Sequence, residues 1–102
     1  MNDNNKSSIQ TTYFIEGCIE VTNILVCFGK NNISLIGNNN FTLTSLAEQI
    51  IDQDSSIIRD MVFYEPKQMF LLGHSSGNLS AWGPGDKGLN HLAINKISSV
   101  FF

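Results

Sequence analysis

The stretch ILVCFGKNNISLIG, residues 24–37, aligns without a gap on FLLGHSSGNLSAWG, residues 70–83, which begins 46 positions further along the chain. Each copy reads as an apolar strand, a polar turn, a second strand and a closing Gly. A repeat of this period is typical of an array of small β-units, because one unit alone cannot bury its apolar face and must stack on a neighbour. The sequence therefore predicts two stacked β-units.

Composition narrows the classes of partner. The 102 residues are 42% hydrophobic and 15% charged, with a net charge of −3, which fits a single domain with a modest core. Lys and Arg number six and are scattered, so we expect no nucleic acid as partner. No apolar run approaches the roughly 18 residues that span a bilayer, so we expect no membrane association.

The first twelve residues are polar and Asn/Ser-rich. They lack the apolar core of a signal peptide and the arginines of a presequence. We therefore expect residues 1–12 to be a disordered tail, residues 13–102 to carry the repeat, and the chain to be cytoplasmic, with a nuclear location as the alternative. In that setting Cys18 and Cys27 are expected to be free, buried, reduced thiols. A disulfide, the alternative, would require an oxidising compartment.

Short apolar runs alternate with turn signals along the rest of the chain. We expect strands at residues 13–15, 18–21, 24–28, 32–36, 57–64, 69–73, 78–82 and 89–94, and a turn at residues 65–68. Residues 83–88, Gly-Pro-Gly-Asp-Lys-Gly, are expected to form only a loop, because Pro and Gly oppose a regular ladder. Residues 97–102 repeat the pattern of residues 58–63 and predict the first strand of a further unit.

One segment is ambiguous between strand and helix. Residues 41–46 alternate strictly, as in a strand, whereas Leu46, Ile50 and Ile51 have helical spacing. We predict a strand across this segment; a strand that ends near Ser45 and is followed by a helical turn would also fit its length. A regular helix across residues 42–52 would instead indicate an α+β fold.

Residues 58–82 resemble the repeat of the WD40 β-propeller family. Ile58, Met61 and Phe63 match the family's inner strand, Glu65-Pro66 its turn, and the segment SGNLSAW at residues 76–82 its Gly-containing turn and Trp-ended strand. The chain departs from the family where Ser76 and Lys30 replace the turn Asp and where Gln53-Asp54 replaces the Gly-His pair. From these departures we expect the family's buried hydrogen-bond network to be absent.

The resemblance implies an all-β fold of two consecutive four-stranded antiparallel propeller-like blades plus the first strand of a third. Trp82 is expected to be a packing anchor between blades. Two blades cannot close a ring, so the outer faces of the terminal blades would be bare, which normally marks an interface. The isolated chain is therefore expected to self-associate or to be completed by other propeller segments.

The chemistry-bearing residues do not form a catalytic or metal-binding pattern. His74 is expected at a hairpin tip with a solvated or turn-bonded imidazole. Ser75 and Ser76 lack a nucleophile elbow, and Asp52 and Asp54 lack the Gly and Glu of a calcium loop. We expect no enzyme activity, no metal and no cofactor.

The predicted function is a non-catalytic protein-interaction module. By analogy with the family, the contact residues would lie in rim loops: Lys30, Gln53, Asp54, His74 and Ser75. The alternative is a structural fragment that completes a multichain assembly through its exposed strand edges and blade faces.

Overall fold

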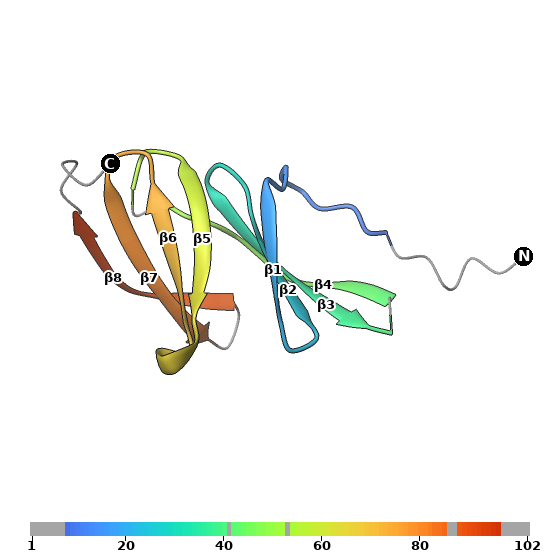
Figure 1. Ribbon diagram of the computed structural model, residues 1–102. Helices are drawn as coiled ribbons and strands as arrows, with labels where there is room; N and C mark the ends of the chain where they lie inside the picture. Colours follow the sequence, from blue (N-terminus) through green and yellow to red (C-terminus); the bar gives the residue numbers. More distant parts are fainter. Residues whose placement is uncertain (1–7, 41, 53, 86–87, 97–102) are drawn as a thin grey trace, which may run out of the picture.

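The computed structural model describes residues 8–40, 42–52, 54–85 and 88–96 (Figure 1). Two four-stranded antiparallel sheets contain most of these residues. Sheet 1 has the order β1-β2-β3-β4, with bounds β1 (Gly17–Val21), β2 (Ile24–Phe28), β3 (Asn32–Asn39) and β4 (Thr42–Ile50). Sheet 2 has the order β5-β6-β7-β8, with bounds β5 (Ile58–Tyr64), β6 (Met69–His74), β7 (Asn78–Gly85) and β8 (Gly88–Lys96).

The all-β class and the two four-stranded antiparallel sheets confirm the coarse prediction from the sequence. The aligned stretches form β2–β3 and β6–β7, the two central strands of each sheet. The 3₁₀ turn Glu65–Lys67 lies where the turn around Pro66 was expected, and Gln68 closes it in the left-handed conformation. The third-blade strand predicted at residues 97–102 lies outside the described residues.

The strand predicted for the ambiguous segment is confirmed, because β4 stays paired with β3 up to Ile50. Two local predictions are wrong. Residues 13–15 form no strand. In the segment predicted as a loop at residues 83–88, residues 83–85 extend β7 and Gly88 begins β8, with Pro84 paired to Leu89, and residues 86 and 87 lie outside the described part of the chain. Pro84 lies beyond the end of the pairing of β6 with β7 at Trp82, so only β8 pairs with β7 at this position, and Pro is tolerated where a strand has one neighbour.

The two sheets are equivalent strand for strand. In both, the pairing of the third and fourth strands shifts by one residue, after Leu35 in sheet 1 and after Ala81 in sheet 2. The extra residues at these two bulges are Leu46 and Leu92, which lie over Gly37 and Gly83 respectively. Because both sheets have this bulge at the equivalent position, their residues can be matched one to one across the third and fourth strands.

Rows of cross-strand neighbours then correspond. The row Ile19–Val26–Leu35–Ala47 of sheet 1 matches the row Val62–Leu71–Ala81–Ala93 of sheet 2. The adjacent row Cys18–Cys27–Ser34–Glu48 matches Met61–Leu72–Ser80–Ile94. Successive rows point to opposite faces of a sheet.

The sheets stack in the same sense, so that β1 contacts β5 and β4 contacts β8 (Figure 1). One core fills the space between them. Sheet 1 contributes Val26, Phe28 and Ile33, sheet 2 contributes Ile58, Met61, Phe70, Leu72, Trp82 and Leu89, and Ile51 of the connection joins them. Trp82 is 2% exposed in this core, as expected of a packing anchor.

A side-chain clamp joins the fourth strands of the two sheets. The Gln49 amide nitrogen donates to the Leu89 carbonyl at 3.0 Å, and its oxygen accepts from the Leu89 N–H at 2.8 Å. Gln49 thereby pairs with one backbone unit of an edge strand. The clamp fixes how the two sheets are aligned.

The two cysteines correct another prediction. Cys18 and Cys27 are directly paired across β1 and β2, with Cα atoms 4.0 Å apart, and form a disulfide. Cys27 is buried, whereas Cys18 is exposed. Sequence spacing did not reveal the pair, because their proximity depends on the hairpin register.

Candidate functional site at the hairpin rim

Backbone hydrogen bonds join two turns and the connection between the sheets at one end of the molecule. The Ile51 N–H donates to the Asn31 carbonyl at 2.8 Å and the Ile58 N–H to the Lys30 carbonyl at 2.7 Å. The Ser75 N–H in turn donates to the Ile57 carbonyl at 2.9 Å. We call this end the hairpin rim: the β2–β3 turn, the β6–β7 turn, and the connection 51–57 between them, without residue 53.

The rim brings together several of the residues predicted to bind a partner. Lys30 and Ser75 are exposed on its two turns, and Asp54 lies on the connection between them. Gln53 lies outside the described residues. His74 is at the rim in sequence only, since its side chain points into the interior.

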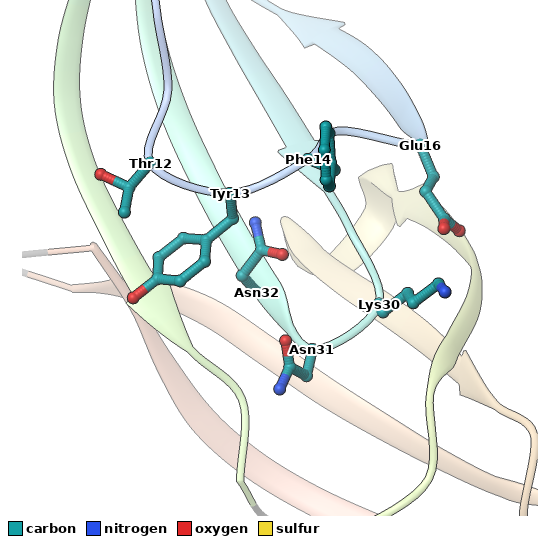
Figure 2. Close-up of a pocket in the computed structure, with 7 residues that line it drawn as sticks. All are labelled: Thr12, Tyr13, Phe14, Glu16, Lys30, Asn31 and Asn32. Atoms are coloured by element: carbon teal, nitrogen blue, oxygen red, sulfur yellow. The ribbon is translucent and has the colours of Figure 1, made fainter.

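Residues 10–16, which we call the N-terminal strap, run beside the β2–β3 turn and complete a cavity of about 370 Å³ (Figure 2). The Glu16 N–H donates to the Phe28 carbonyl at 2.7 Å and fixes one end of the strap. Thr12 fixes its middle, because its N–H and Oγ1 donate to the two carboxylate oxygens of Glu48 at 2.8 and 2.7 Å. The cavity is lined by Thr12, Tyr13, Phe14, Glu16, Lys30, Asn31 and Asn32.

Asn32 lies between strap and turn in Figure 2 and is the buried polar group of this cavity. It is 2% exposed, yet its Nδ2 has no hydrogen-bond partner within the protein. A buried amide that lacks a partner costs free energy, and a ligand carbonyl could remove that cost. Lys30, Glu16 and the 94%-exposed ring of Phe14 also line the cavity, and the side chain of Lys30 extends away from Asn32 toward Glu16 (Figure 2). The cavity can therefore offer hydrogen-bond donors beside aromatic surface.

Asp54 organises the other half of the rim. Its Oδ1 accepts from the Ser56 N–H at 2.7 Å, and its Oδ2 accepts from the Ser76 hydroxyl and from the Asn78 amide, both at 2.6 Å. These bonds from Ser56, Ser76 and Asn78 hold the pKa of Asp54 well below its usual range. The carboxylate thus ties the connection to the β6–β7 turn as a fixed negative charge.

The position of His74 corrects the expectation of a solvated or turn-bonded imidazole. It is 6% exposed, and its Nε2 lies 2.7 Å from the Ser80 hydroxyl, which also accepts the Trp82 indole N–H at 2.8 Å. Burial lowers the pKa of His74, against the opposing charge of Asp54. The network expected to be absent is that of the family's turn Asp and Gly-His pair; sheet 2 has a different buried network, formed by His74, Ser80 and Trp82.

The strap and the burial of Asn32 do not follow from the sequence pattern. That pattern predicts Tyr13 and Phe14 in a strand and Asn32 at the start of the strand 32–36. The two adjacent aromatic residues at the edge of a polar tail were the available signal. No sequence signal indicated the burial of Asn32, because this burial depends on how the strap crosses the β2–β3 turn.

Within the described residues, no group of three His, Cys, Asp or Glu side chains could hold a metal ion. The same part of the chain has no helix that could span a bilayer. Searches found no match to a known family model, a curated protein or a solved structure.

Proposed function

We propose that the chain is a non-catalytic protein-interaction module, a two-sheet piece of a WD40-like propeller that binds an extended polypeptide at the hairpin rim. The observation that carries this proposal is the cavity in which the buried Asn32 Nδ2 lacks a partner beside the exposed Lys30. A main-chain carbonyl of a bound segment would accept from Asn32. Tyr13 and Phe14 would cover apolar side chains of the same segment.

The stacking of the sheets supports the propeller part of the proposal. Blades of a propeller follow one another in the same sense, with first strands together at one side and fourth strands together at the other. Here β1 contacts β5 and β4 contacts β8, and the registers of the two sheets correspond through the shared bulge. The fold alone does not determine a function, so the proposed function rests on the residues of the hairpin rim.

The test is selection of a ligand followed by one charge reversal at the rim. A library of random twelve-residue peptides would be selected on the immobilised chain, and the affinity of an enriched peptide measured by fluorescence anisotropy. Lys30→Glu should weaken binding at least about tenfold, which corresponds to about 1.4 kcal/mol. Lys67→Glu, which reverses an exposed Lys on the 3₁₀ turn after β5, is the matched control and should leave the affinity unchanged.

Two results would contradict rim recognition. One is a library from which no peptide is enriched. The other is an enriched peptide that binds the Lys30 and Lys67 variants equally well. In either case the structural-fragment function, which uses sheet faces, would become the better explanation.

A further inference from the structure

The outer face of sheet 2 is an apolar sheet surface without a covering layer among the described residues. Val62, Tyr64 and Leu92 are 52%, 43% and 56% exposed, and Leu71, Leu79 and Ala81 lie partly buried beside them. The equivalent row in sheet 1, which contains Ile19, Val26 and Leu35, packs against sheet 2. Sheet 2 therefore repeats the surface with which sheet 1 binds another sheet.

The opposite end of the molecule is already occupied. Glu48 and Ser34 are cross-strand neighbours on the outer face of sheet 1, and Glu48 accepts both hydrogen bonds from Thr12 of the strap. Asn32, Ser34 and Ile36 are all buried on this face. A second molecule that added its sheet 2 there would have to displace the strap.

We propose that the outer face of sheet 2 binds the same face of a second copy of this chain, related by a two-fold axis. As far as the described residues show, each copy has one free sheet face and one face held by its own strap, so the association closes at two copies. The result is a stack of four sheets with a strap at each end. This contact does not involve the hairpin-rim cavity, so it is independent of the function proposed above.

The charges on this face permit self-association. Beside the apolar residues, β5 carries one charge of each sign, Arg59 and Asp60, both exposed. When two copies meet through this face, opposite charges as well as like charges come together, although each chain has a net charge of −3. The contact is driven by apolar burial.

The size of the face sets the expected strength. Four strands about 4.8 Å apart, each about seven residues of 3.3 Å, cover roughly 400 Å² per copy. Two such faces bury roughly 800 Å² together, which is below the roughly 1,200 Å² of stable specific interfaces and in the range of weak, transient ones. We expect a dissociation constant between about 1 and 100 μM.

The experiment is sedimentation equilibrium of the full chain from 1 to 300 μM. The double variant Val62→Glu/Leu92→Glu places two charges on the proposed contact and should stay monomeric throughout. The control Leu46→Glu/Ile50→Glu changes two apolar residues of sheet 1 with similar exposure, 54% and 46%, and Leu46 is the bulge counterpart of Leu92. It should dimerise within about twofold of the unaltered chain. All four side chains are exposed, and far-UV circular dichroism would verify that both variants are folded.

Mixing distinguishes the two-fold contact from a head-to-tail one. Fluorescently labelled Val62→Glu/Leu92→Glu chain, mixed with unaltered chain, should not enter dimers, because both partners need an intact face. In a head-to-tail contact, its sheet 1 would still accept an unaltered partner. A monomeric unaltered chain at 300 μM, species larger than a dimer, entry of the labelled variant, or loss of dimer in the sheet 1 control would each overturn the proposal. Lys30→Glu should dimerise normally, which separates this result from the test of the rim.

Discussion

In sheet 1 the disulfide pair Cys18–Cys27 occupies the position that Met61–Leu72 occupies in sheet 2. The pair in sheet 2 faces the shared core, and both of its side chains are buried by sheet 1. The pair in sheet 1 faces outward, where Cys18 is exposed. The same register position thus holds a buried apolar pair in sheet 2, where sheet 1 covers it, and a disulfide in sheet 1, where no other described sheet covers it.

The neighbouring position extends the comparison. Ser80 bonds to His74 and Trp82, whereas its counterpart Ser34 is fully buried with an unpartnered Oγ. At the position of His74, sheet 1 has Gly29, where a Cβ would collide with the Phe14 carbonyl and the Asn32 side chain. Sheet 1 therefore accommodates the strap, and sheet 2 accommodates a hydrogen-bonded network.

The largest expected effect comes from removing the disulfide of sheet 1. Cys18→Ser/Cys27→Ser should lower the free energy of unfolding by about 2.5 kcal/mol, because the disulfide closes a loop with a sequence separation of 9 in the unfolded chain. Urea denaturation followed by circular dichroism would measure it. A reductant should destabilise the unaltered chain by a similar amount and leave the variant unchanged. Equal stability of oxidised and reduced chain would show that the disulfide does not support sheet 1.

A paired substitution tests the two serines. Ser80→Ala should cost about 2 kcal/mol, because it leaves the Trp82 N–H and His74 Nε2 without their buried partner. Ser34→Ala removes a buried hydroxyl that has no partner, so it should change stability by less than about 0.5 kcal/mol or increase it. Both would be measured from urea midpoints. If the two variants cost the same, the network does not distinguish the sheets.

The smallest effect is a pH dependence that belongs to sheet 2. Burial lowers the pKa of His74, so the unfolded chain binds more protons than the folded chain once the pH falls below about 6.5, and stability decreases there. The melting temperature should fall between pH 7.5 and 5.5, a range above that in which Asp54 takes up a proton. His74→Gln should flatten this dependence, and His91→Gln should keep it. A slope that persists in His74→Gln would assign the effect to other groups.

The sequence alone determined the strands and their division into two units. Alternating apolar residues and Gly- and Asn-containing turns act over a few positions, so these local patterns suffice to locate β2–β3, β6–β7 and most of β4. Of the candidate site, the sequence placed Lys30, Asp54 and Ser75 in turns, and the structure brings these turns together at one rim.

The tertiary structure decided which face each residue occupies. The offset of 46 positions in the gapless alignment holds for β3 and β7. In β2 and β6, however, the register makes Val26 the counterpart of Leu71, an offset of 45. The offsets differ because the β6–β7 turn is one residue longer than the β2–β3 turn. A shift of one residue moves a side chain to the other face of a sheet. Hence Phe28, by alignment the counterpart of His74, is in fact the counterpart of Gly73. The disulfide, the buried His74 and the strap over Asn32 all depend on this long-range pairing, which local sequence patterns do not encode.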